Sequence, residues 1–538
     1  MRSLFGEKWV TGVLVVLLLG MLVGLGGSVL AAEGKTTLTI AITADPRGLS
    51  PVYACTYHDW VVGYRLYSSL FQADENYEAA PDLAESWEVS RDGLTYTFHL
   101  KRHATFHDGS PITSEDVEFS VMEVNLPQGS ICARGPQTVI ESVETPDQHT
   151  IIFHLSAPLP EFLNPHDGLG AHCSGVLKKE LYEGTDLFTN PYNLEPVGSG
   201  PFKFVEWVRG SHIVLERYEG YHGELPAIER IVFRIIGDPM ARTLAFEKGE
   251  VDWVPFETPA SEVARLNSLP GNNVLFHPTP CADDVLFGFN MRNEPFNDKT
   301  VRKALTAAID KQKIVDLVYF GEGAVIGTGY VGLTAFSSWW QDPEAKQIEY
   351  DPELAAVLLD QAGYPVKEDG WRFHFTLKHT TGYTEHIKVA ELIKDDLKKV
   401  NVDVKIISLD HAAWHGQVFE DWDFDTSFFP FCTGPNPTTL KRLHSENIKR
   451  VSWQNAMAFS NSEYDALFGL MVSETDVEKR VKLTHRMQEI LAEEQPGAYL
   501  IHRLTGTAVK EGRFTEEPKN VWTFGYVWMH LNKIKPIE

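Results

Sequence analysis

The chain has 538 residues, of which 74 are Asp or Glu and 48 are Lys or Arg, so its formal net charge at pH 7 is −26. A folded part of roughly five hundred residues is too long for one hydrophobic core and predicts two lobes or three subdomains. The acidic residues are spread along the chain and would repel the phosphates of nucleic acids and anionic lipids, so we expect neither as a partner.

Residues 1–31 have the pattern of a signal peptide for export. Arg2 and Lys8 supply the positive start, residues 10–23 are nearly all apolar, and Ala31 ends a candidate cleavage site. An uncleaved membrane anchor is the alternative, but glycines interrupt the apolar run. No cysteine stands at the cleavage point. We therefore expect a cleaved periplasmic protein without a lipid anchor.

In the first half of the chain, strands and helices are expected to alternate. Strands are expected over 38–42, 94–100, 150–155 and 231–236, and apolar residues alternate in 94–100. Other expected features are an aromatic-rich loop over 51–60, a helix capped by Thr113 and a helix over 238–250.

The second half is more regular. Helices are expected after a cap at Asn297 or Asp298, after Asp310 and after Asp351, the last with Leu354, Val357 and Leu358 as its buried stripe. A strand over 371–377, a helix over 386–399 and a strand over 402–406 predict a βαβ unit with parallel strands. A final helix is expected over 477–491.

Three segments follow one another closely near the N-terminus. Residues 81–87 read Pro-Asp-Leu-Ala-Glu-Ser-Trp, residues 92–100 read Asp-Gly-Leu-Thr-Tyr-Thr-Phe-His-Leu, and residues 106–117 read Phe-His-Asp-Gly-Ser-Pro-Ile-Thr-Ser-Glu-Asp-Val. This run resembles the signature of family 5 of the extracellular solute-binding proteins, which includes the dipeptide-, oligopeptide- and nickel-binding receptors of ABC importers. The turn Gly-Ser-Gly-Pro-Phe at 198–202 and the segment 290–310 are also close to that family's pattern.

The resemblance implies an α/β fold like that of the periplasmic binding proteins of the cluster C type. Such a fold has two lobes, a hinge and an extra subdomain in lobe I. Lobe I is then expected to comprise 33–75, 196–279 and 503–538, the extra subdomain 76–195, and lobe II 280–502. A solute would bind between the lobes and favour the closed form.

The segment 425–437 is the most informative about the solute. In the peptide receptors of this family a Trp-Cys-Ala-Asp-like stretch lies here, and its Asp pairs with the α-ammonium group of the peptide. Phe431 and Cys432 match the Trp and the Cys, but Gly434 stands at the position of the Asp. Loss of that carboxylate removes a partner that a dehydrated ammonium group needs, which argues against ordinary peptides without excluding them.

The chain has five cysteines, all in the part expected to be exported, so disulfides are expected and one cysteine stays unpaired. Cys281 matches the family partner of Cys432, so the resemblance implies a Cys281–Cys432 disulfide. Cys132 with Cys173 is the next pair expected, which leaves Cys55 free beside the cleft.

Aromatic residues at expected loop positions are the remaining candidates for the pocket wall. Together with Cys432, Thr433 and Gly434, the expected solute-contacting set comprises Tyr53, Tyr57 and Trp60 of lobe I and Trp414, Phe428 and Phe431 of lobe II. Aromatic walls suit sugar faces, aromatic acids and peptide side chains equally. The competing interpretation is that about half of these rings belong to the core.

Catalysis is the main competing class of function. The sequence holds no GxSxG, HExxH or Walker-type phosphate loop, and we expect no catalytic residue. His411 and His415 have the i, i+4 spacing of one edge of a metal site, but two partly exposed histidines are the simpler interpretation, so we expect neither metal nor cofactor.

The sequence therefore predicts a monomeric periplasmic receptor that captures a short peptide or a similar polar solute for a membrane ABC permease and ATPase complex. One alternative is the same role for an oligosaccharide, an opine or an organic acid. An alternative of another class is a secreted hydrolase.

Overall fold

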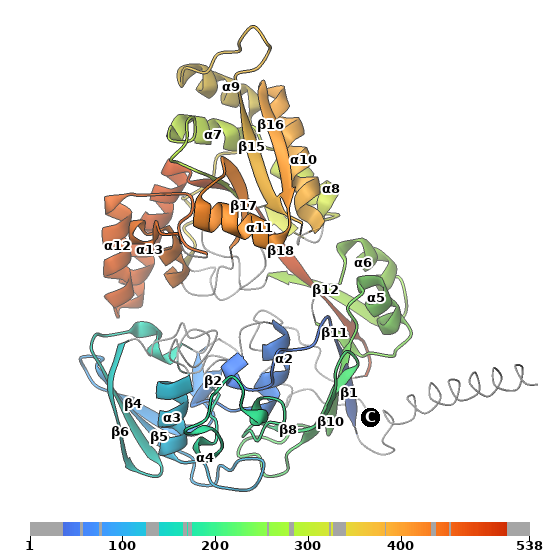
Figure 1. Ribbon diagram of the computed structural model, residues 1–538, viewed down its shortest axis with the longest axis vertical. Coiled ribbons are helices and arrows are strands. Elements are labelled where there is room, and N and C mark those ends of the chain that lie inside the picture. Colours follow the sequence, from blue (N-terminus) through green and yellow to red (C-terminus); the bar gives the residue numbers. More distant parts are fainter. Residues whose placement is uncertain are drawn as a thin grey trace, which may run out of the picture.

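Figure 1 shows the computed structural model of the chain, in which two lobes are joined at one side by long strands. The structure describes residues 36–53, 57–74, 78–124, 139–164, 169, 175–255, 258–278, 284–321, 324–326, 340–381, 384–431, 437–450 and 453–513. Within these ranges, no helix is both long and apolar enough to cross a membrane.

The lower lobe in Figure 1 is organised around strand β1 (Thr37–Ile42), whose apolar side chains are buried. β1 pairs in parallel with β10 (Arg230–Ile235) and with the short β11 (Trp253–Val254). Beyond β10 the sheet continues antiparallel through β9 (His212–Arg217) and β8 (Phe202–Val208). The strands predicted over 38–42 and 231–236 are β1 and β10.

Three longer helices accompany this sheet: α2 (Tyr57–Leu66), α5 (Pro239–Glu247) and α6 (Ala260–Asn267). α5 begins after Asp238, whose side chain accepts a hydrogen bond from the N–H of Ala241, and it ends before Gly249, which has a φ of 72°. An N-cap acid followed by Pro and a left-handed glycine at the end are local signals, so the sequence places this helix closely.

A separate four-stranded antiparallel sheet forms the left part of the lower lobe in Figure 1, in the order β4-β5-β7-β6. Its strands are β4 (Ala84–Val89), β5 (Thr95–Leu100), β7 (Thr150–Leu155) and β6 (Ile140–Asp147). Phe98, Phe153 and Phe162 are fully buried beneath it. The expected strands over 94–100 and 150–155 are confirmed, because every second residue is apolar and faces this core.

Shorter elements complete this lobe. The Asp116 carboxylate accepts hydrogen bonds from the backbone N–H and the hydroxyl of Thr113, which confirms the cap predicted there. The elements are α3 (Ser114–Phe119), α4 (Lys179–Tyr182), the hairpin β2 (Phe71–Ala73) with β3 (Ala79–Pro81), and the one-turn helices η1 (Pro51–Tyr53) and η4 (Pro160–Leu163).

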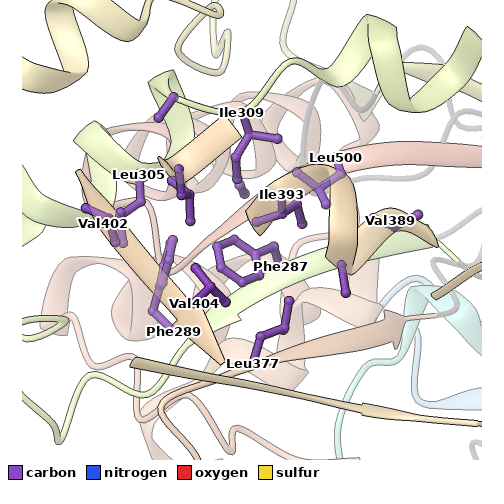
Figure 2. Close-up of a cluster of buried hydrophobic side chains, with 14 of the residues drawn as sticks. Phe287, Phe289, Leu305, Ile309, Leu377, Val389, Ile393, Val402, Val404 and Leu500 are labelled. Carbon is purple, nitrogen blue, oxygen red and sulfur yellow. The ribbon is translucent and has the colours of Figure 1, made fainter. Parts of the chain in front are cut away.

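The upper lobe contains the strands β16, β15, β17 and β13, in this spatial order. Their bounds are β13 (Asp284–Phe289), β15 (Phe373–Thr380), β16 (Val402–Leu409) and β17 (Thr426–Phe431). β15 and β16 pair in parallel and are linked by helix α10 (Thr384–Lys399), so the predicted βαβ unit is confirmed. Figure 2 shows its core, in which Leu377, Val404 and Phe287 of the sheet lie near Val389 and Ile393 of α10.

The other helices of the upper lobe begin at acidic or amide caps. Asp298, Asp310, Asp351, Asp410, Asn461 and Asp476 each accept a backbone hydrogen bond in the first turn. The helices are α7 (Lys299–Ala307), α8 (Lys311–Val318), α9 (Pro352–Gln361), α11 (His411–His415), α12 (Ser462–Ser473) and α13 (Val477–Glu494).

The buried face of α9 differs from the prediction. Leu354 and Val357 are exposed and Leu358 is half-buried, whereas Ala355 and Leu359 are fully buried. α9 packs on α7, and Ala355 and Leu359 belong to the same buried hydrophobic cluster as residues of α7. Hydrophobicity alone could not indicate this, because apolar residues lie on both sides of the helix.

One strand belongs to both lobes. β18 (Gly497–Lys510) pairs with β13 from Gly497 to Ile501, and then with β12 (Asn272–Pro278) from Leu504 to Lys510. It also contacts β11 and the short β14 (Ala324–Ile326). β18 and β12 lie at the right of Figure 1, where the two lobes meet.

Candidate functional site

Helix α2 lies at the top of the lower lobe in Figure 1. Its side chains line a hollow. The wall of the hollow includes Ser50, Asp59, Trp60, Tyr64, Tyr67 and Ser69. Three aromatic rings and four hydroxyl groups, two from serines and two from tyrosines, therefore line the hollow.

The spacing of these rings follows from the helix. The sequence predicted a loop over 51–60, but the described part of this segment enters helix α2 at Tyr57. Trp60 and Tyr64 are then one turn apart, and Tyr67 lies one further turn along the same face. Tyr64 and Tyr67 were missed by the sequence analysis, although the i, i+4, i+7 spacing of aromatic residues was the signal that could have identified them.

The negative charge of Asp59 in the hollow is already paired with Arg47. The Asp59 carboxylate accepts hydrogen bonds from the backbone N–H of Arg47 at 2.9 Å and from its Nη2 at 3.0 Å. Asp59 is buried, so its charge acts on Arg47 rather than on open solvent. A cationic solute would have to compete with this guanidinium group for the carboxylate.

The C-terminal end of α2 is held by the turn at 198–202. The carbonyl oxygen of Leu66 accepts hydrogen bonds from the N–H groups of Ser199 and Gly200, both at 2.9 Å. A Cβ atom on Gly198 would lie 1.8 Å from that oxygen, and one on Gly200 would lie 2.4 Å from the carbonyl oxygen of Arg65. Only glycine lets the two backbones come this close.

His107 of the Phe-His-Asp-Gly segment forms hydrogen bonds to the backbone of the same turn. Its Nδ1 accepts a hydrogen bond from the N–H of Gly198 at 3.2 Å, and its Nε2 lies 3.1 Å from the carbonyl oxygen of Gly200. The ring is therefore the neutral tautomer with its proton on Nε2. Burial lowers the pKa of His107 to about 4, against the opposing effect of the Gly200 carbonyl.

A buried cation lies in α2 next to the hollow. Arg65 is 1% exposed, and burial lowers its pKa to about 9. The side chain of Tyr67 is also buried, which raises its pKa well above the usual value, so its hydroxyl stays neutral and can donate a hydrogen bond.

Of the residues predicted for the lower-lobe wall, Trp60 lines the hollow. Tyr53 lies outside its wall, where its hydroxyl donates to the carbonyl oxygen of Phe188 and its ring packs edge-on against the Phe188 ring. Tyr57 is the first residue of α2. Cys55 lies outside the described residues.

Two of the aromatic residues predicted for the upper-lobe wall are buried in hydrophobic cores. Trp414 and Phe428 have no exposed surface, and the indole N–H of Trp414 donates to the Ser427 hydroxyl at 2.9 Å. Their rings fill two hydrophobic cores and offer no surface to a solute in this structure. Phe431 ends β17 opposite Asp284, whereas Cys432, Thr433 and Gly434 lie outside the described residues.

The predicted histidine pair lies on α11. His411 and His415 have ring centroids 6.3 Å apart, and both rings contact Trp453. Within the described ranges, no three His, Cys, Asp or Glu side chains are grouped as metal ligands would be. Cys281, Cys132 and Cys173, like Cys432, fall outside those ranges.

The chain is similar to proteins of one family along most of its length. The model of the bacterial extracellular solute-binding proteins, family 5 Middle, matches residues 78–443. The oligopeptide-binding protein AppA of Bacillus subtilis (strain 168) is 28% identical over 488 residues, which cover 88% of this chain and 87% of that protein.

Two solved structures show the same fold with different bound molecules. The periplasmic binding protein DppA from Helicobacter pylori, in complex with the peptide STSA, is 25% identical with a TM-score of 0.74, and the match covers 93% of this chain and 98% of DppA. The binding protein AgaA from A. tumefaciens R10, in complex with agropinic acid, is also 25% identical, with a TM-score of 0.72 over 93% of this chain and 99% of AgaA.

Proposed function

Because this chain belongs to the bacterial extracellular solute-binding proteins of family 5, we propose that it captures a short peptide or a similar polar solute between its lobes. Members of this family are binding proteins that work with an ABC permease and ATPase complex. The observation that carries the proposal is the aromatic hollow lined by side chains of α2. This helix lies at the top of the lower lobe in Figure 1, towards the upper lobe.

Capture by lobe closure requires a hinge. We propose lobe I at 33–75, 196–279 and 503–538, the extra subdomain at 76–195 and lobe II at 280–502. Support comes from β18, which changes its partner from β13 to β12 between Ile501 and Leu504. Two neighbouring chain crossings allow rotation about one axis, and a solute that contacts both lobes stabilises the closed form.

A short peptide is the first candidate for the solute, as in the relatives that bind peptides. A non-peptide solute such as an opine, an oligosaccharide or an organic acid is the second candidate. Two observations favour the second. Gly434 provides no carboxylate for an α-ammonium group, and Asp59 in the hollow is already paired with Arg47.

The decisive measurement is native mass spectrometry of the freshly purified protein, followed by small-angle X-ray scattering with the compound that it retains. We expect a bound small molecule and a decrease in the radius of gyration when it is added back. Absence of compaction with every retained or added compound would refute capture by lobe closure.

The role of position 434 is tested with tri- to pentapeptides that carry either a free or an acetylated N-terminus. Without a carboxylate at 434, acetylation should change the dissociation constant less than about tenfold, since no dehydrated ion pair is lost. Gly434→Asp should improve binding of the free peptides only, and Gly434→Asn is the matched uncharged control. A large preference of the unsubstituted protein for free N-termini would refute this interpretation.

We further propose that residues 1–31 are removed on export and that the mature protein is a periplasmic monomer without a lipid anchor. The support is the order of positive start, apolar run and small-residue site in the sequence. Intact-mass analysis of the secreted protein tests this proposal, because an acylated or uncleaved form would differ in mass.

A further inference from the structure

Glu161 and Arg480 form an ion pair that joins the two lobes away from the strands that connect them. Glu161 lies in η4, beside the four-stranded sheet, and Arg480 lies in α13 of the upper lobe. The Nη2 of Arg480 donates to the Oε1 of Glu161 across 319 residues of sequence. In Figure 1, α13 is on the side of the upper lobe opposite β12 and β18, so the contact closes the side that faces away from the connection.

Both charged groups are buried in this contact. The side chain of Arg480 is 8% exposed and that of Glu161 is 6% exposed. Removing a carboxylate and a guanidinium group from water is costly, and each is tolerated because the other compensates it. If the lobes separated, both groups would return to water, so the pair exists only in a form with the lobes together.

Each lobe holds its own half of the pair rigidly. Next to Glu161, the fully buried Phe162 packs against Tyr96 with ring centroids 4.4 Å apart. The guanidinium group of Arg480 lies 5.3 Å from the ring centroid of Trp340, which belongs to the core of the upper lobe. The distance between the two charges therefore depends on the relative position of the lobes rather than on a mobile loop.

The pair is incompletely hydrogen-bonded. The second carboxylate oxygen of Glu161 and the Nε of Arg480 are buried and find no hydrogen-bond partner within the described part of the chain. A buried pair with unsatisfied atoms gains little net free energy over its hydrated components. Such a contact can be made and broken repeatedly, unlike a permanent structural bridge.

We infer that Glu161 and Arg480 are positioning residues for solute capture: without contacting the solute, each keeps the closed form accessible by compensating the buried charge of the other. The inference rests on the proposed capture by lobe closure. Loss of either partner would shift the equilibrium towards the open form, and a solute that binds the closed form would then have a weaker apparent affinity.

The test compares the full-length mature protein with Arg480→Met and Glu161→Gln, after removal of retained solute by dialysis in urea and refolding. Each single substitution leaves one buried charge without its partner and should shift the equilibrium about 100-fold towards the open form. The measured changes are a larger radius of gyration in scattering and faster hydrogen exchange of the amides at 161–164. In the double variant Glu161→Gln/Arg480→Met no unpaired charge remains. Its radius of gyration and its hydrogen exchange at 161–164 should therefore be closer to those of the unsubstituted protein than in either single variant.

Arg486→Met is the matched control. Arg486 lies on the same helix and pairs with Glu463 at 2.7 Å, but that pair is exposed and stays within the upper lobe. We expect Arg486→Met to leave the radius of gyration and the exchange at 161–164 unchanged.

Two outcomes overturn the inference. One is that Arg480→Met and Glu161→Gln leave both measurements unchanged, and the other is that Arg486→Met changes them equally. This failure is distinct from failure of the proposed function, in which the unsubstituted protein shows no compaction with any solute.

Discussion

The carbonyl oxygen of Leu66, at the end of helix α2, lies where a Cβ atom of residue 198 would be, only 1.8 Å from that position. The same oxygen accepts the N–H groups of Ser199 and Gly200. The helix that carries the aromatic hollow is therefore held in place by a turn from a distant part of the chain.

Gly198→Ala is expected to destabilise the protein by about 1–3 kcal/mol, because a side chain there would push the turn away from a backbone atom that cannot yield. The midpoint of urea unfolding measures the change. Gly469→Ala on α12 is the control, since a Cβ there meets nothing within 4 Å and alanine favours a helix, so it should be neutral or stabilising. Equal unfolding midpoints for Gly198→Ala and the unsubstituted protein would show that the turn is not tightly packed.

The stability of the folded protein should fall as the pH decreases from about 6.5 to about 4. Burial lowers the pKa of His107 to about 4, so in this range the unfolded chain binds a proton that the folded protein excludes. The contribution of His107 is complete above its unfolded pKa and is lost as pH falls through the folded one. Between pH 7.5 and pH 5 the loss is about 2 kcal/mol.

Urea unfolding at pH 7.5 and pH 5 measures the loss in the free energy of unfolding. His107→Gln should reduce this loss, because glutamine does not titrate. The buried His386, whose pKa burial lowers to about 3, titrates in the same direction and leaves a residual slope. A pH dependence that is unaltered in His107→Gln would contradict the assigned neutral state.

We expect a disulfide between Cys281 and Cys432. The antiparallel pairing of β13 with β17 places Asp284 opposite Phe431. In the sequence, Cys281 comes shortly before Asp284, and Cys432 directly follows Phe431. Peptide mapping without reduction should recover a cross-linked pair. Replacing both cysteines by serine should lower the free energy of unfolding by about 2–4 kcal/mol. Cys55→Ser is the control, because it removes a cysteine that is expected to be unpaired. Free alkylation of Cys281 in the native protein would exclude the bond.

Trp60→Ala should weaken binding of the retained solute by roughly tenfold or more, since a buried aromatic contact contributes on the order of 1–3 kcal/mol. The shift of the melting temperature by that solute is the measurement. Tyr53→Phe is the control, because it removes only a hydroxyl that bonds to Phe188 outside the wall of the hollow. An undiminished shift in Trp60→Ala would place the solute elsewhere.

Local patterns predicted much of the secondary structure. Asp310 and Asp351 cap helices as expected, and the residues of 150–155 alternate as a strand does. The segment around residues 57–66 was different. The sequence predicted an aromatic-rich loop over 51–60, but the chain enters helix α2 at Tyr57.

By itself, the sequence determined the family, the alternating strands and helices, and the helix ends, because these depend on residues close together in the chain. Tertiary structure alone decided that Trp414 and Phe428 are core residues while Trp60 and Tyr64 line a hollow. It also decided that Glu161 meets Arg480. The physical reason is that burial depends on which distant element packs against a side chain, and no local pattern records that partner.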